Sequence, residues 1–221
     1  MDVIIVSKTR MSNAVCVGGV LANGRFVRLL DKNGHNQDID TDFKIGDVYT
    51  MTFQERTNIR PPHTEDILVD SAQYKFTFES IAKMVSYLTH KLNVNIWRGG
   101  ISSLFDRNLL WTSSGSGYIS ANGQIPMQST GFWLPDKDLR RSDYGDKVRY
   151  SYPLTPILNS GDDLLGLVVQ SRYISFVGLQ EPVDIIPANT LVRVSLARWW
   201  QRPDSVDEER CYLQLSGWYL G

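Results

Sequence analysis

TLVRVSLARWWQRPDSVDEERCYLQLSGWYLG, residues 190–221, is the stretch that decides the fold. Two runs of alternating apolar and polar residues flank a polar loop that contains proline, a pattern typical of two antiparallel strands joined by a hairpin connection. Successive side chains of an extended strand point to opposite faces. In the first run Val192, Val194 and Leu196 therefore share one face. Arg193 lies on the other.

The second run predicts a strand with one apolar and one mixed face. Cys211, Leu213 and Leu215 share the apolar face. The opposite face carries Tyr212, Gln214, Ser216 and Trp218. Aromatic and hydrogen-bonding groups of this kind can stack a base and, with nearby arginines, bind a phosphate. The same face can equally be the underside of another layer of protein, and the residues leave both interpretations open.

Composition restricts the class of protein. The chain has 221 residues, 42% of them hydrophobic and 21% charged, which is ordinary for a soluble globular protein. This length suits one large β domain or two small ones. The net charge of −1 contrasts with the basic excess typical of proteins that hold duplex nucleic acid non-specifically. A local basic groove remains compatible with that total.

The sequence also indicates a compartment. No apolar run approaches the roughly 20 residues that cross a bilayer, and the opening MDVIIVSKTRM does not resemble a secretory signal, so we expect no membrane partner. Cys16 and Cys211 each lie within an apolar strand pattern. Buried thiols fit such positions better than a disulfide does, and they favour a cytoplasmic protein.

The first 78 residues predict a β-rich unit of short strands and turns. Gly18 and Gly19 lie inside a strand pattern, where glycine marks a bulge or a close backbone approach. Asn23–Gly24 is a hairpin signal, and the strand returns from Arg25. Close spacing of such strands favours a small barrel or a sandwich.

One amphipathic helix follows, within residues 79–94. Ile81, Met84, Val85, Leu88 and Leu92 form one stripe at helical spacing, and a serine at position 80 is a suitable N-cap. We expect this helix to pack against a sheet and to connect two β-rich units.

Residues 95–221 predict the second β-rich unit, with long loops. Residues 95–150 hold three tryptophans among many glycines and serines, and the charged segment 136–150 reads as a mobile loop. Strands resume at 164–169 and 173–179 before the terminal pair.

Signatures of catalysis are weak. The three histidines have no metal-ligand spacing, and there is neither a phosphate-binding glycine loop nor a hydrolase elbow. We therefore expect no metal and no cofactor. Catalysis is less expected than binding.

Three short segments carry groups suited to ligand binding. SKTRM, residues 7–11, is predicted to be a loop after the first strand, whose hydroxyls and cations Lys8 and Arg10 can hold a phosphate or carboxylate. WRGG at 97–100 places a flat ring beside a guanidinium. Of the two neighbouring tryptophans 199 and 200, one is expected to pack inward and the other to be exposed beside arginines. Each segment also has a plain structural interpretation, as solvated charge or core.

The two ends of the chain resemble a known family. IIVSKTRMSNAVCVGGVLANGRFVRLL, residues 4–30, is similar to the start of bacterial dual OB-fold proteins, and VSLARWW (194–200) with RCYLQLSGWY (210–219) is similar to their closing hairpin. The resemblance implies a mainly β fold of two small OB-like barrels with one connecting helix. It also implies a nucleic-acid or nucleotide partner in a bacterial or phage setting.

The leading hypothesis is a non-catalytic binding module for single-stranded nucleic acid or a nucleotide. Its predicted surface comprises Lys8, Arg10, Arg28, Trp97, Arg98, Arg193, Trp199, Tyr212 and Trp218. A protein-interaction or scaffold module is the first alternative, because interfaces also favour aromatics and arginine. An enzyme acting on a nucleotide or small molecule is the second. The oligomeric state and the ligand's identity are open at this point.

Overall fold

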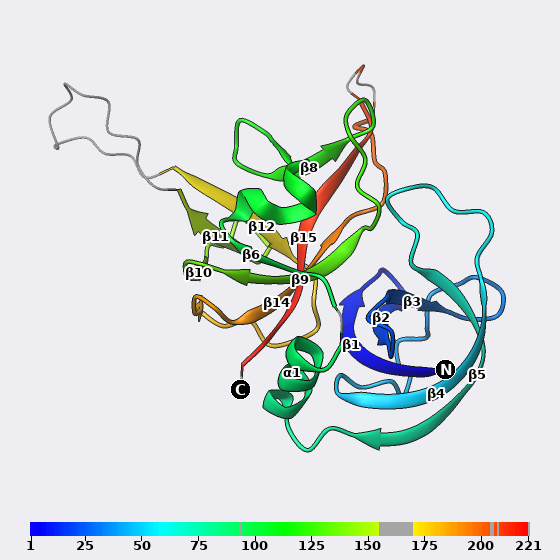
Figure 1. Ribbon diagram of the computed structural model, residues 1–221. Coiled ribbons are helices and arrows are strands. Elements are labelled where there is room, and N and C mark those ends of the chain that lie inside the picture. The colour runs from blue at the N-terminus through cyan, green and yellow to red at the C-terminus, as the bar shows by residue number, and fades with distance from the viewer. Residues whose placement is uncertain (93, 155–169, 204–205, 207, 221) are drawn as a thin grey trace, which may run out of the picture.

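The fold is mainly β, as predicted, with a closed barrel in the N-terminal half and a ten-stranded sheet in the C-terminal half. The computed structural model describes residues 1–92, 94–154, 170–203, 206 and 208–220. One helix, α1, lies at the lower edge of the molecule where the two halves meet (Figure 1).

Five strands close the N-terminal barrel in the order β1-β2-β3-β5-β4. They are β1 (Asp2–Arg10), β2 (Val15–Leu21), β3 (Phe26–Leu30), β4 (Asp47–Glu55) and β5 (Asp66–Thr77). The neighbours β3 and β5 run parallel, and the other pairs are antiparallel. The barrel interior is filled by apolar side chains that alternate along these strands, among them Val3, Ile5, Val17, Leu29, Met51 and Ile67.

The predicted hairpin at Asn23–Gly24 is confirmed. Gly24 has a φ of +85°, a left-handed conformation that glycine adopts without steric cost, and it links β2 to β3. The predicted loop at residues 7–11 is wrong, because β1 continues to Arg10. Lys8, Thr9 and Arg10 pair with the start of β2, and their backbone groups are satisfied in that ladder.

The glycine pair in β2 marks both a bulge and a close approach. The β1–β2 register shifts between Ile5 and Ser7, opposite Gly19 and Gly18. A Cβ atom on Gly18 would lie 2.5 Å from Nη2 of Arg193 and 2.5 Å from Oγ of Ser7. Glycine is therefore required at position 18 so that the arginine of the other half can reach the barrel.

The helix α1 (Ile81–His90) begins where the sequence predicts. The hydroxyl of Ser80 accepts a hydrogen bond from the backbone N–H of Lys83, which caps the first turn. Met84 and Leu88 are completely buried. They belong to an apolar cluster that joins Ile4, Val6 and Phe26 of the barrel to Phe132, Leu191 and Tyr219 of the second half. The helix therefore connects the halves by packing against both.

The C-terminal sheet follows the order β13-β10-β11-β12-β15-β14-β9-β6, with β7 and β8 off this path. Its first elements are β6 (Ile96–Gly99), the short 3₁₀ segment η1 (Ile101–Arg107), β7 (Leu110–Trp111), β8 (Gly117–Ser120) and β9 (Thr130–Pro135). Its later strands are β10 (Leu139–Arg141), β11 (Arg149–Pro153), β12 (Ser171–Phe176), β13 (Ile185–Ile186), β14 (Leu191–Leu196) and β15 (Arg210–Tyr219).

The terminal hairpin is confirmed, with one correction. β14 pairs with β15 in antiparallel fashion, but Arg193 faces Gly217 while Val194 faces Leu215. Ser216 is thus the extra residue of a bulge, which reverses the side-chain alternation beyond it. Trp218 consequently joins Leu215 in the core and is 4% exposed. Its predicted place on the mixed face is wrong.

Two further sequence interpretations differ from the structure. The charged segment 136–150 is no loop: β10 pairs with β11, with Arg140 opposite Ser151. The expected strand at 173–179 appears as β12, whereas 164–169 lies outside the described residues. The division into domains at 1–78, 79–94 and 95–221 stays a prediction.

Two plain features complete the fold. No helix in the described ranges is long and apolar enough to cross a membrane. Cys16 and Cys211 both carry free thiols; Cys211 is buried and Cys16 is partly exposed.

Candidate functional site

A polar seam joins the two halves. Arg193 Nη1 of β14 donates to Ser7 Oγ of β1 at 2.6 Å. Trp199 Nε1 donates to the carbonyl of Pro61 at 2.8 Å. The hydroxyl of Tyr219 also donates to the carbonyl oxygen of Val6. Outside the α1 cluster, these contacts between the halves are hydrogen bonds. Polar side chains therefore face the space between the two halves.

Such a space exists beside the seam, and we call it the chamber. It has a volume of about 260 Å³. The barrel contributes Thr9, Cys16, Arg28, His63, Glu65 and Asp66 to its walls. The C-terminal half contributes Ser129, Arg193, Ser195, Arg198, Gln214 and Ser216. Gln214 and Ser216 are on the non-core face of β15, the mixed face that the sequence indicates. At these residues that face is covered by the barrel, and it also lines the chamber between the two halves.

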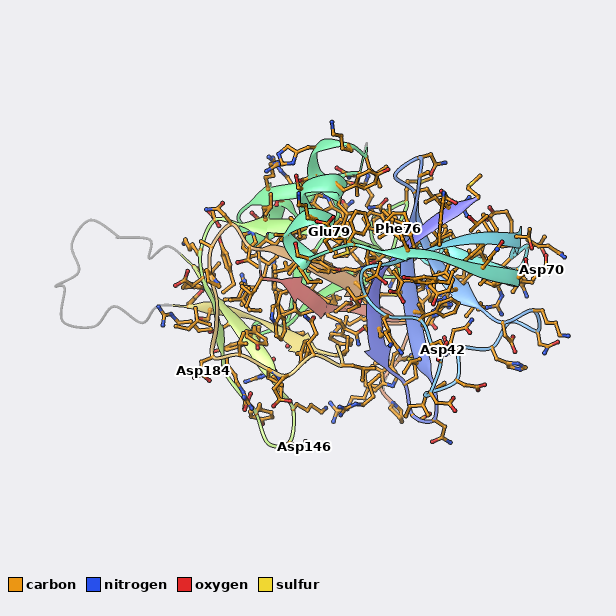
Figure 2. The ribbon with its side chains drawn as sticks, turned by 90° about the horizontal axis from the view of Figure 1, so that it is seen from below. Asp42, Asp70, Phe76, Glu79, Asp146 and Asp184 are labelled. Atoms are coloured by element: carbon orange, nitrogen blue, oxygen red, sulfur yellow. The ribbon has the colours of Figure 1, made fainter. Side chains whose placement is uncertain are left out.

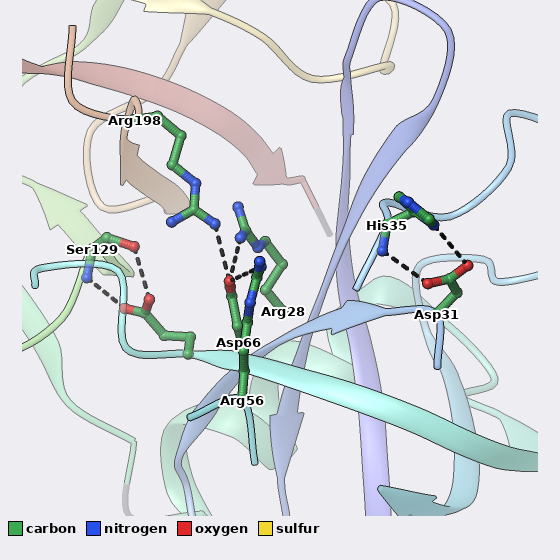
Figure 3. A network of polar contacts seen from close by, with 8 residues as sticks. Arg28, Asp31, His35, Arg56, Asp66, Ser129 and Arg198 are labelled. Atoms are coloured by element: carbon green, nitrogen blue, oxygen red, sulfur yellow. Dashed lines mark hydrogen bonds and ion pairs between the residues drawn. The ribbon is translucent and has the colours of Figure 1, made fainter. Parts of the chain in front are cut away.

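Three arginines converge on one carboxylate at the chamber wall (Figure 3). Oδ2 of Asp66 accepts from Arg28 Nη2 at 2.6 Å, Arg198 Nη2 at 3.0 Å and Arg56 Nη1 at 3.2 Å. The parallel pairing of β3 and β5 places Arg28 directly opposite Asp66. Arg198 follows β14, so this ion-pair cluster spans both halves.

Glu65 is the second carboxyl group of the chamber wall. It accepts hydrogen bonds from the backbone N–H of Ser129 and, at 2.8 Å, from the Ser129 hydroxyl. Burial raises the pKa of Glu65, and the hydrogen bonds from Ser129 oppose that rise. This carboxyl group is therefore committed to joining the barrel to the start of β9.

His63 lies between the chamber and the core of the second half. Burial, with the positive charge of Arg28 nearby, lowers the pKa of His63 to about 4. Its Nε2 is 3.7 Å from Sγ of Cys211, and burial raises the pKa of that thiol to about 12. At neutral pH the pair is thus an uncharged imidazole beside an uncharged thiol, which lacks the thiolate of a reactive cysteine.

Arg193 is the most deeply placed cation of the chamber, at 5% exposure. Burial lowers its pKa. Its guanidinium lies 6.0 Å from the ring centroid of Phe26 and donates to Ser7, both in the barrel. A buried cation bound mainly to neutral groups is costly, so this position is unusual for a purely structural residue.

An aromatic row extends from the chamber along the same face of β15. Tyr212 is the next residue on that face after Gln214, and it pairs with Tyr118 of β8 across the strands. Ring centroids are 6.0 Å apart for Tyr118 and Tyr212 and 6.2 Å for Trp200 and Tyr212. Arg210 lies 4.4 Å from the centroid of Tyr118. Trp200, the outermost ring, is 49% exposed.

A larger cavity adjoins the chamber on another side. It has a volume of about 660 Å³ and shares Met11 and Gln214 with the chamber. Arg10 and Lys147 are the cations on its walls, and Phe176 contributes a ring. A ligand larger than the chamber can therefore continue past Gln214.

Four of the predicted site residues belong to this region. Arg28 and Arg193 line the chamber, Arg10 lines the adjoining cavity, and Tyr212 is in the aromatic row. Trp199 is half-buried at the edge of the seam, with the guanidinium of Arg60 4.9 Å from its ring.

The other four lie elsewhere. Lys8 Nζ donates to the carbonyl of Thr41 at 3.1 Å. Arg98 is exposed on β6, three strands from β15 in the sheet. Trp97 is 7% exposed and packs against Phe105 at a centroid distance of 4.7 Å, and Trp218 is equally enclosed. These two rings have no free face on which a base could stack.

Sequence reasoning missed several members of the site. Glu65, Asp66 and Arg56 come from a polar stretch that reads as a loop, and Trp200 could not be told from Trp199. The three charged residues flank the connection between β4 and β5: Arg56 follows β4, Glu65 precedes β5 and Asp66 is its first residue. Among the described residues, no cluster of three or more metal-ligating side chains occurs.

Acidic side chains outside the chamber include Glu208 and Glu209, which pair with Arg210 and Arg60, respectively. Asp42 and Asp70 lie at the periphery of the barrel, and Asp146 and Asp184 lie at the periphery of the other half (Figure 2). The near-neutral total charge thus conceals an uneven distribution, with arginines gathered at the seam.

The fold and the seam define a protein of two OB-like β halves that share a polar chamber and an aromatic row. A model of the dual OB-containing domain family matches residues 1–218, nearly the whole length, and the chain belongs to this family. The resemblance found at the two ends of the sequence is thereby confirmed. A search of curated proteins and a search of solved structures found no match. OB-fold domains commonly bind nucleic acids or proteins.

Proposed function

We propose that this chain is a non-catalytic binding module for single-stranded nucleic acid. The observation that carries the proposal is the pair of accessible rings Tyr212 and Trp200, which are backed by the buried Tyr118 beside Arg210 on the face of β15 that leads to the chamber. Stacking on an aromatic side chain contributes roughly 1–3 kcal/mol per base and tolerates any sequence. Two such contacts suffice for useful affinity without a strongly basic protein.

Charge at the seam supports a polyanionic ligand. Arg198 and Arg56 are partly exposed beside the chamber, and Arg210 lies at the aromatic row. Arg210 shares with Tyr212 one face of β15, so a strand stacked on the rings would also meet a cation. The near-neutral total charge agrees with few phosphate contacts and argues against a duplex-coating protein.

The test is fluorescence anisotropy with a labelled 15-nucleotide single strand at low salt. Trp200→Ala and Tyr212→Ala are each expected to weaken binding by roughly 5- to 150-fold, the equivalent of losing one stacked base. Tyr74→Ala is the matched control, because Tyr74 is 55% exposed, packs on the ring of Tyr49 in the barrel and lines neither cavity.

Binding that is unchanged in the first two variants would contradict the proposal, as would no binding by the unaltered protein at tens of micromolar.

The protein-interaction and enzyme alternatives stay predictions. For the first, β5 offers two exposed aromatic side chains, Tyr74 and Phe76, of which Figure 2 labels Phe76. For the second, both carboxyl groups of the chamber are already engaged by Ser129 and by arginines.

A further inference from the structure

The chamber carries an excess of positive charge. Among the described residues, three arginines line its walls, Arg28, Arg193 and Arg198, beside two carboxyl groups, Glu65 and Asp66. A fourth, Arg56, reaches Asp66 from outside this lining. Even with both carboxyls ionised, two positive charges are uncompensated. Arg193 is buried among mainly neutral groups, and the other three arginines share one carboxylate, so an anion from solution would improve the charge balance.

Hydrogen-bond donors of the same arginines are also left over. Nε of Arg28 and Nε of Arg193 are buried and make no hydrogen bond to the described residues. A buried donor without a partner is destabilising. Both side chains line the chamber, and a ligand with several acceptor oxygens there could pair with them. Asp66 offers a single oxygen, Oδ2, to three guanidinium groups, which is an incomplete match for their donors.

We propose that the chamber is a binding site for a phosphate monoester. A monoester carries about −1.5 to −2 charges at neutral pH and three acceptor oxygens, which matches an excess of two charges. A backbone diester carries a single charge and matches less well. Arg28 and Arg198 would bind the phosphate either by releasing the Asp66 carboxylate or while keeping their ion pairs with it.

The volume and position of the chamber indicate which molecule bears the phosphate monoester. The chamber volume of about 260 Å³ is below the roughly 300–1,000 Å³ of pockets that enclose a whole small molecule, so the phosphate end of a larger ligand fits best. The aromatic row begins at Tyr212, the next residue on this face after Gln214 of the chamber wall. The monoester is then the terminal phosphate of a nucleic-acid strand, and this part of the inference rests on the proposed function.

The experiment compares one single strand in three forms, with a 5′-phosphate, with a 3′-phosphate and with hydroxyls at both ends, each labelled internally. One phosphorylated end is expected to bind at least tenfold more tightly than the hydroxyl form. Arg198→Gln is expected to bring this ratio close to one. Arg140→Gln, an arginine paired with Asp138 on the exposed β10, is the control that keeps the ratio.

A second readout uses Cys16, which lines the chamber and is partly exposed. Inorganic phosphate and a nucleoside monophosphate are expected to slow its modification by a thiol reagent, whereas the nucleoside alone is not. Thermal unfolding of each variant verifies that it is folded.

The outcomes separate the two proposals. Equal binding of all three strands, with no protection of Cys16 by phosphate, overturns the phosphate site and leaves the strand-binding function intact. Protection of Cys16 by the monophosphate without any strand binding overturns the proposed function and supports the phosphate site with a free nucleotide as its ligand. Absence of both effects overturns both.

Discussion

The guanidinium of Arg193 and the hydroxyl of Ser7 meet at 2.6 Å across the seam, although 186 residues separate them in the chain. The contact passes directly over Gly18, whose missing side chain leaves the space that the guanidinium fills. One arginine, one serine and one glycine thus fix how closely the halves approach beside the chamber.

Replacement of that glycine tests the close approach. Gly18→Ala would place a methyl group 2.5 Å from both Arg193 Nη2 and Ser7 Oγ, and the buried arginine has little room to retreat. We expect a loss of about 1–3 kcal/mol in the free energy of unfolding, measured by urea titration. Gly123→Ala is the control, because its new contacts would be 3.6 Å or longer. Equal stability of the two variants would show that the seam is not close-packed there.

The hydrogen bonds of Glu65 predict a large cost of truncation. Glu65→Ala leaves the buried backbone N–H and hydroxyl of Ser129 without their acceptor, at about 1–3 kcal/mol for each buried group. Glu55→Ala, which breaks an exposed pair with Arg25, is expected to cost under about 1 kcal/mol. Urea unfolding of both variants measures the contrast, and a similar loss for each would contradict the assigned role of Glu65.

The lowered pKa of His63 predicts a pH dependence of stability. An unfolded histidine binds a proton near pH 6.5, whereas His63 in the folded protein does so only near pH 4. The unfolded state therefore binds more protons between these values, and the free energy of unfolding falls as pH drops from about 6.5 to 4, by roughly 3 kcal/mol at most.

The control for this prediction is His63→Gln, whose pH profile is expected to lack that component. Glu65 acts in the opposite sense, because its raised pKa makes the folded state bind the extra proton and stability falls as pH rises above about 4.5. The difference between the wild-type and His63→Gln profiles isolates the histidine. Parallel profiles would mean that His63 is not shielded from water.

Salt dependence reports the number of phosphates contacted. For a single strand the slope of log K against log salt is about −0.7 per phosphate, so two or three contacts predict about −1.4 to −2. Affinity should then fall about 7- to 20-fold between 50 and 200 mM salt. Arg210→Gln is expected to make the slope about 0.7 shallower. A slope near zero would show that the arginines do not contact phosphates of the bound strand.

The two thiols are expected to react at very different rates. Burial raises the pKa of Cys211 to about 12, whereas Cys16 is partly exposed at the chamber wall. Labelling at pH 8 followed by peptide mass spectrometry should modify Cys16 in the folded protein and Cys211 only in denaturant. Comparable labelling of Cys211 without denaturant would indicate that the core of the second half opens readily.

Local patterns explain why much of the fold could be predicted. Alternation identified β14 and β15, the Asn23–Gly24 turn identified the β2–β3 hairpin, and the stripe through Met84 and Leu88 identified α1. Each of these signals is contained within a short stretch of sequence. Residues 95–150 lack one, because their strands are short and several pair with distant segments, as β8 does with β15 and β9 with β14.

The site was harder to predict because it depends on contacts between distant segments. A single bulge at Ser216 moves Trp218 from the predicted surface to the core. Asp66 becomes a centre of charge only when β3 and the end of β14 bring Arg28 and Arg198 to it. Nothing in the sequence around Asp66 records either partner.

The shared chamber has a consequence for synthesis on the ribosome. Strands β1 to β5 emerge first and can close their barrel early, as N-terminal domains often do. Arg193 and Arg198 emerge much later, so the nascent barrel displays Glu65 and Asp66 balanced by Arg28 and Arg56, and the edge gains its excess of positive charge only when the last hairpin docks. A ribosome-bound fragment that stops before Leu191 would therefore lack the two arginines that give the finished edge its positive excess.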